Sequence, residues 1–134
     1  MKIKLGLFSV LLLLFFVLPS VSSEQPMQYG NASWYGKAFH GKKTASGKYY
    51  DMNEFTGAHR NLPFGTKVKV RNLRNGKEVI VEVNDRGPFV RSRVIDLSRA
   101  AAKAIGIVNR GIVRVSIEVI SYPYGLAPTP GSML

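Results

Sequence analysis

Alternating valines in the centre of the chain predict a β-hairpin. Residues 67–71 alternate between basic side chains and valine, and residues 79–83 alternate between valine and either Ile80 or Glu82. Asn75-Gly76 lies between the two runs, and an Asn-Gly pair favours the tight turns that join antiparallel strands. A period of two residues directs one side of each strand toward a core and the other toward solvent.

Shorter apolar runs predict further strands and one small helix. We expect strands at residues 31–35, 94–95 and 113–119, a helix at 99–105, a turn at 62–65, and exposed loops at 37–47 and 84–93. Ser98 is a suitable N-cap for the helix, and Gly106 is suited to its end. Many short strands in a small domain favour an all-β fold, and closing the sheet into a barrel removes exposed edges. The pattern predicts an all-β barrel and leaves the pairing order of its strands open.

The N-terminal segment has the three parts of a secretory signal peptide. Lys2 and Lys4 precede an apolar run at residues 5–18, Pro19-Ser20 interrupts it, and small residues follow at 21–23. A transmembrane anchor is the alternative, but the 14 residues of the run would span about 21 Å of a bilayer core of about 30 Å. We expect a cleaved signal peptide (1–23), a short lead-in (24–29), one folded domain (30–120) and a flexible tail (121–134).

Composition and charge limit the kinds of site and of binding partner that the protein can have. Removal of residues 1–23 would leave 111 residues with a net charge of +9, enough chain for one domain. The sequence has no cysteine and two histidines, which excludes disulfides, thiolate metal sites, a cysteine nucleophile and lipid attachment through cysteine. We therefore expect no metal and no cofactor, and a monomer without stable membrane insertion. For an exported chain, the charge favours acidic envelope polymers or anionic lipid headgroups over nucleic acid; a solvated basic surface is the alternative.

Asp85 and Asp96 differ from the other acidic residues because each lies near the end of a predicted strand. Strand ends at a barrel rim are where a small scaffold can display functional side chains. Two neighbouring carboxylates raise one pKa, so one group can stay protonated as an acid while the other is ionised. The structural alternatives are a helix cap for Asp96 and a turn residue for Asp85. Glu78, Glu82 and Glu118 lie on strand faces opposite apolar residues, and we expect them to be solvated.

One histidine and an aromatic pair add candidate ligand contacts. His59 lies among small residues and can hydrogen-bond a carboxylate or a sugar hydroxyl, although a lone histidine is more often structural. Trp34 and Tyr35 offer aromatic surface on which a sugar ring can stack. Core packing is the alternative for one member of that pair.

Six ordered segments carry a more specific signal. They are Ala32-Ser33-Trp34-Tyr35-Gly36, Phe39-His40-Gly41, Thr44-Ala45-Ser46-Gly47, Ala58-His59-Arg60 with Leu62-Pro63-Phe64-Gly65-Thr66, Asn84-Asp85-Arg86-Gly87-Pro88-Phe89, and Val94-Ile95-Asp96-Leu97-Ser98 with Ala100-Ala101. Their order and spacing resemble the rare lipoprotein A (RlpA-like) family of double-psi β-barrel domains, over roughly residues 30–120. The resemblance implies a six-stranded barrel and endolytic cleavage between N-acetylmuramic acid and N-acetylglucosamine in peptide-stripped peptidoglycan strands. The implied product has a 1,6-anhydromuramic end.

The resemblance also implies roles for individual residues. Asp85 matches the aspartate of the family's Asn-Asp-Arg-Gly-Pro motif, and Asp96 resembles the aspartate before Leu-Ser in related barrels. We expect one of them to be the acid/base and the other to tune it, with His59 orienting the substrate. We expect substrate contacts from Trp34, Tyr35, Lys48, Asn84 and Arg86.

Lys48 departs from the family pattern, which usually carries glutamate directly after the Thr-Ala-Ser/Asn-Gly segment. A lysine there can instead contact an anionic group of the glycan. With the +9 charge, it motivates the alternative of a non-catalytic peptidoglycan-binding or expansin-like wall-loosening module. The absence of cysteine removes the lipid anchor usual in the family, so we expect an exported protein that is periplasmic or secreted.

Overall fold

The computed structural model describes residues 16–17 and 26–125 of the chain. The predicted signal peptide lies outside the described residues except for 16–17, and so does the part of the predicted tail beyond Gly125. Within the described ranges, no helix is long and apolar enough to cross a membrane.

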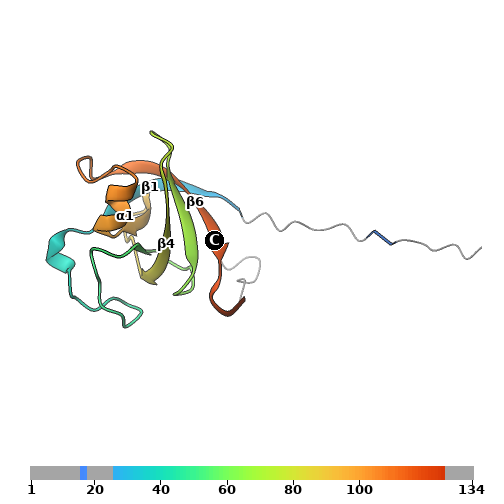
Figure 1. Cartoon of the computed structure of the whole chain (residues 1–134), viewed down its shortest axis with the longest axis horizontal. Coiled ribbons are helices and arrows are strands. Elements are labelled where there is room, and N and C mark those ends of the chain that lie inside the picture. The colour runs from blue at the N-terminus through green and yellow to red at the C-terminus, as the bar shows by residue number, and fades with distance from the viewer. Residues whose placement is uncertain (1–15, 18–25, 126–134) are drawn as a thin grey trace, which may run out of the picture.

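Six strands in the described part of the chain close into a barrel (Figure 1). They are β1 (Gln28–Trp34), β2 (Thr56–Ala58), β3 (Lys67–Asn72), β4 (Glu78–Asp85), β5 (Arg93–Leu97) and β6 (Val113–Ser121). The order around the barrel is β1-β5-β2-β4-β3-β6. The pairs β1/β5 and β2/β4 are parallel, and the other neighbouring pairs are antiparallel. The predicted all-β, six-stranded barrel with one short helix is confirmed.

The central hairpin forms as its valine pattern predicts. β3 and β4 are antiparallel, with Val68 opposite Val81 and Val70 opposite Val79. Gly76 turns the chain with a φ of 75°, a left-handed conformation that glycine adopts without steric cost. The valines on one side of both strands are buried in the barrel core, where each contributes on the order of 1.5–3 kcal/mol through removal from water.

Within the described ranges, one α-helix packs against the barrel, in contact with β4 and β1. It is α1 (Arg99–Ala104), and Figure 1 shows it beside β1. Ser98 caps it by accepting a hydrogen bond from the Ala101 amide, as predicted. Ala101 and Ala102 are buried in the core cluster. The helix ends at Ala104, one residue before the predicted end, because Ile105 has already left helical torsions and acts as the C-cap.

Three features differ from the sequence prediction. β1 begins at Gln28 rather than 31, because Gln28 and Tyr29 still pair with β6, so the predicted lead-in contributes to the barrel. β2 had no predicted counterpart, since its three residues Thr-Gly-Ala show no alternation. Two short 3-10 helices, η1 (Lys37–Phe39) and η2 (Pro123–Gly125), lie within the predicted loop and tail.

Gly57 explains how so short a strand enters the barrel. A Cβ at this position would lie 3.2 Å from the carbonyl oxygen of Asp96 and 3.3 Å from the Ile95 side chain. Glycine therefore permits the close approach of β2 to β5. Because β2 is the strand between β4 and β5, this approach sets the distance between the two candidate aspartates.

Candidate active site

Asp85 lies at the end of β4 and lines a small open hollow. Its Oδ1 accepts hydrogen bonds of 2.9 Å from the backbone amides of Ala45 and Arg86. No donor within residues 26–125 is bonded to Oδ2. The hollow has a volume of about 110 Å³ and is lined by Asp85, Tyr35, Phe39, Lys42, Lys43, Thr44 and Tyr50. The carboxylate is thus held through Oδ1 at the edge of the hollow.

Asp96 is held more tightly than Asp85. Its Oδ1 accepts a 2.6 Å hydrogen bond from the Ser33 hydroxyl and lies 3.2 Å from Nε of Arg93. Its side chain is 14% exposed, and it does not line the Asp85 hollow. These contacts tie the Asp96 carboxylate to β1 through Ser33 and to its own strand through Arg93.

Tyr35 lies within electrostatic range of both aspartates. Its hydroxyl is buried and has no hydrogen-bond partner among the described residues. Burial, followed by the negative charges of Asp85 and Asp96, raises the pKa of the Tyr35 phenol above its ordinary value. The phenol therefore stays protonated as a donor close to both carboxylates. Its ring packs edge-on against Tyr50, with ring centroids 5.0 Å apart.

His59 does not line the Asp85 hollow. The residue is 3% exposed, and its Nδ1 accepts from the backbone amides of Asn61 and Leu62. Its Nε2 lies 2.9 Å from Oε1 of Gln28, so Nε2 carries the proton in this arrangement. Burial, then the charges of Arg60 and Arg86, lowers the pKa of His59 to about 4. Both ring nitrogens are occupied within the protein, while the His59 amide donates to the Asp85 carbonyl.

Arg86 and Trp34 are likewise engaged with the protein. The Arg86 guanidinium donates to the carbonyls of His59 and Leu62 and stacks 3.9 Å from the centre of the Phe64 ring. Trp34 is partly buried against the core cluster. Neither residue lines the Asp85 hollow.

A second, larger pocket adjoins the Asp85 hollow through the turn at residues 44–47. Its volume is about 360 Å³, and it is lined by Ser46, Lys48, Phe64, Gly65, Glu82, Val83, Asn84, Pro123 and Tyr124. Thr44 lines the first hollow and Ser46 the second. The turn is held on β4, because the Ala45 amide binds the Asp85 carboxylate and the Ser46 amide donates to the Asn84 carbonyl.

Glu82 is the site residue that the sequence pattern did not reveal. Glu78 and Glu118 form the surface ion pairs expected of solvated acids, with Arg71 and Lys69. Glu82 instead lies in the wall of the second pocket. The chain around Lys48 and the helix η2 lie around the same pocket as Glu82. Strand periodicity does not encode this arrangement of distant segments.

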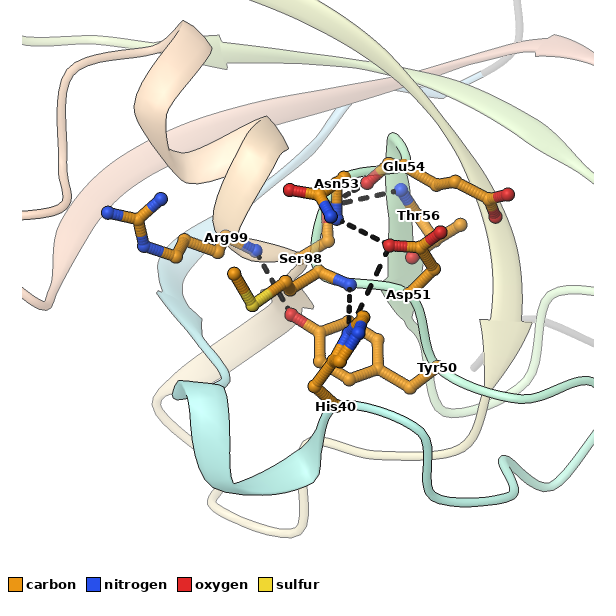
Figure 2. A network of polar contacts seen from close by, with 9 residues as sticks. His40, Tyr50, Asp51, Asn53, Glu54, Thr56, Ser98 and Arg99 are labelled. Carbon is orange, nitrogen blue, oxygen red and sulfur yellow. Dashed lines mark hydrogen bonds and ion pairs between the residues drawn. The ribbon is translucent and has the colours of Figure 1, made fainter.

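A polar network fixes the segment at residues 50–56, which contributes Tyr50 to the lining of the first hollow. Figure 2 shows the Tyr50 hydroxyl accepting from the Arg99 amide at the start of α1, while Nδ1 of His40 accepts from the Met52 amide. Ser98 donates to the Glu54 carbonyl and accepts from the Thr56 amide. The helix start thereby anchors both Tyr50 and β2. In the described ranges, no three His, Asp or Glu side chains gather as metal ligands would.

Comparison with known proteins identifies a family and a fold. The family model described as lytic transglycolase matches residues 27–117. The endolytic peptidoglycan transglycosylase RlpA of Neisseria meningitidis serogroup A is 59% identical over 93 residues, 69% of this chain and 39% of that protein. The probable endolytic peptidoglycan transglycosylase RlpA of Synechocystis sp. is 57% identical over 91 residues, 68% and 28% of the two chains. This chain thus spans less than half the length of these curated relatives.

Solved structures support the same architecture. The Streptomyces papain inhibitor superposes with a TM-score of 0.60 at 23% identity, covering 74% of this chain and 98% of that one. An apo expansin of Clavibacter michiganensis gives a TM-score of 0.59 at 24% identity, covering 75% and 53%. These likenesses establish the double-psi barrel fold alone. Because the family model covers most of the chain and the relatives exceed 50% identity over two thirds of it, this protein belongs to the RlpA-like lytic transglycolase family of double-psi β-barrel domains.

Proposed function

We propose that this domain is an endolytic peptidoglycan lytic transglycosylase that uses Asp85 as its acid/base. The observation that carries this is the Asp85 carboxylate, which is fixed through Oδ1 by two backbone amides in a residue that lines an open hollow together with Tyr35 and Tyr50. Membership of a family whose relatives are named endolytic peptidoglycan transglycosylases supports the reaction class.

The reaction needs one carboxyl group and no water. Protonated Asp85 donates its proton to the glycosidic oxygen, and the bond from that oxygen to C1 of N-acetylmuramic acid breaks. N-acetylglucosamine leaves with a free 4-hydroxyl. The 6-hydroxyl of the muramic residue then attacks C1, and its proton passes to the Asp85 carboxylate, which restores the acid. The product end is a 1,6-anhydro sugar, one water lighter than the end that hydrolysis with a second activating carboxylate would leave.

The remaining candidate residues support this role from around Asp85. The Asp96 carboxylate binds Ser33 and Arg93, and the Tyr35 phenol offers a hydrogen-bond donor to a sugar oxygen. His59 is proposed as a positioning residue, since its amide holds the Asp85 carbonyl. Arg86 fixes the segment that begins at His59 and contributes to substrate binding through the wall that it shapes with Phe64.

Mass spectrometry of the products tests the proposal. The protein, incubated with peptide-stripped glycan strands, is expected to release fragments with 1,6-anhydromuramic ends from within the strands. Reducing ends alone would indicate hydrolysis instead. If no fragments appear at any protein concentration, the domain does not catalyse this reaction.

We further propose that the protein acts outside the cytoplasm, after cleavage behind Ser23, as a monomer. The lysines, apolar run and small residues of the N-terminal segment support export. Determination of the N-terminus of the exported protein is expected to give Glu24. Recovery of the intact Met1 terminus from the envelope would contradict cleavage.

A non-catalytic glycan-binding module is the second candidate function, favoured by Lys48. This lysine lines the second pocket at the position where the family usually carries glutamate. A pure binder would sediment with insoluble peptidoglycan and release no soluble fragments. An active enzyme would release fragments under the same conditions.

A further inference from the structure

The second pocket combines polar and aromatic groups in a space large enough for a sugar. Its volume of about 360 Å³ falls in the range of pockets that hold small ligands. Four segments meet around it: the chain at 46–48, the turn at 64–65, the end of β4 and the helix η2. It shares the turn at 44–47 with the Asp85 hollow, so one polysaccharide chain can contact both.

Asn84 lines this pocket and has an amide oxygen without a partner among the described residues. The residue is 5% exposed, and its Oδ1 is buried without a hydrogen-bond partner in the described part of the chain. A primary amide both donates and accepts hydrogen bonds. An acetamido group has one N–H and one carbonyl, so it can satisfy both functions of the Asn84 side chain. The same interaction would supply the partner that the buried oxygen lacks.

Lys48 brings a positive charge to the same pocket. Its side chain lines the pocket, and no acidic partner lies within ion-pair distance of it among residues 26–125. Glu82 lies in the pocket wall too and opposes an incoming anion. Lys67, opposite Glu82 on β3, offsets part of that negative charge. The ammonium of Lys48 is therefore suited to a carboxylate of the ligand.

Tyr124 supplies exposed aromatic surface at the rim. It is 97% exposed and has a positive φ of 57°, a conformation that is unfavourable for a bulky side chain. Phe64 also lines the pocket, and its ring stacks with the Arg86 guanidinium. An apolar sugar face can pack on such rings while its polar edges reach Asn84 and Lys48.

We infer that this pocket binds an N-acetylated sugar that carries a carboxylate, through Asn84 for the acetamido group and Lys48 for the carboxylate. This inference deepens the proposed function and rests on it for the choice of peptidoglycan as the ligand. Two groups of peptidoglycan have this chemistry: the lactyl carboxylate that muramic acid exposes once its peptide is removed, and a carboxylate of an attached stem peptide. The pocket thus distinguishes glycan strands by the negative charge that they carry beside the reaction centre.

Calorimetric titration against four probes distinguishes the lactyl carboxylate from a stem-peptide carboxylate as the group that is bound. The probes are a peptide-free glycan oligosaccharide, the same oligosaccharide with its lactyl carboxylates converted to methylamides, a peptide-bearing oligosaccharide, and chitotetraose, which has acetamido groups but no carboxylate. The full chain with Asp85→Asn is used so that no probe is cleaved. We expect the peptide-free oligosaccharide to bind about tenfold more tightly than its methylamide and than chitotetraose. Tightest binding of the peptide-bearing probe would assign the stem peptide as the carboxylate source.

Substitutions in the same background identify the residues responsible. Lys48→Met is expected to remove the preference for carboxylate probes and to leave chitotetraose affinity unchanged, whereas Lys48→Arg should retain the preference. Glu82→Gln should strengthen carboxylate binding, since it removes the opposing charge. Asn84→Leu should weaken all four probes. Lys77→Met, an exposed lysine that is not part of the pocket, is the control for net charge.

Two outcomes would overturn the inference. One is equal affinity for all four probes, and the other is a preference for carboxylates that survives Lys48→Met. Binding is measured without turnover, so failure here leaves the anhydro-product test unaffected. Conversely, a protein that forms no anhydro ends can still show the carboxylate preference.

Discussion

Asp85 and Asp96 are register partners of one residue, Ala58, from the two strands that border β2. One strand therefore separates them, and at about 4.8 Å per strand spacing their backbones lie about 10 Å apart. Burial, and then the negative charges of both aspartates, raise the pKa of the Tyr35 phenol, so each carboxylate acts electrostatically on the same hydroxyl.

The first prediction concerns Asp85 as acid/base. Asp85→Asn keeps an oxygen that can accept from the Ala45 and Arg86 amides, so the fold should retain its stability. Removal of the ionisable group should lower the rate of anhydro-end formation by about 10²- to 10⁴-fold. Quantitative mass spectrometry measures the rate. Asp51→Asn, which replaces an exposed aspartate, is the matched control; equal rates in wild type and Asp85→Asn would refute the assignment.

The second prediction separates Asp96 from Asp85. Asp96→Asn removes the charge that faces Arg93 and weakens the bond from Ser33, in a side chain that is mostly buried. The free energy of unfolding should fall by about 1–3 kcal/mol. Denaturant titration measures it. If Asp96→Asn is fully stable and Asp85→Asn is unstable, Asp85 has the structural role and Asp96 becomes the candidate for catalysis.

The third prediction concerns the Tyr35 hydroxyl. Because this hydroxyl is buried without a partner, Tyr35→Phe should leave stability unchanged or raise it by about 1 kcal/mol. The same substitution should lower turnover about tenfold through loss of a donor to the substrate. Thermal unfolding and product release are measured on one preparation. A stability loss with normal turnover would show that the hydroxyl serves the fold instead.

The fourth prediction is a pH dependence of stability from His59. Its pKa is lowered to about 4 in the folded state, against about 6.5 unfolded. The unfolded chain therefore binds more protons between these values, and stability should decrease as pH falls through this interval, by about 3 kcal/mol in total at the low end. Denaturant titrations from pH 4 to pH 7 measure the slope.

Two variants isolate the contribution of His59 to that slope. His59→Gln should be less stable at pH 7, and its stability should change less between pH 7 and pH 4. His40→Gln is the matched control, because the His40 ring is about half exposed. If all three proteins have parallel pH profiles, the buried imidazole is not the source.

The fifth prediction concerns Ser98 as the link between α1 and β2. Its hydroxyl accepts from the Thr56 amide and donates to the Glu54 carbonyl (Figure 2). It also accepts from the Ala101 amide in the first turn of α1. Ser98→Ala should cost about 2 kcal/mol of unfolding free energy, since it removes the cap and leaves buried groups unpaired. Ser92→Ala, at an exposed loop position, should be neutral. A loss in both variants would point to a general effect of replacing serine.

The sequence determined those features that depend on neighbours along the chain. The valine alternation around Asn75-Gly76 predicts the β3–β4 hairpin, because strand periodicity and turn chemistry are local. Ser98 and Gly106 mark the ends of α1 for the same reason. The family motif likewise singled out Asp85, which the structure leaves open to a hollow.

The tertiary structure alone decided how these local pieces combine into a site. β2 has no periodicity of its own and becomes a strand because β4 and β5 pair with it on either side. Burial of His59 and placement of Glu82 in a pocket wall arise from segments distant in sequence. Such contacts follow from packing of the closed barrel, and no pattern within one segment encodes them.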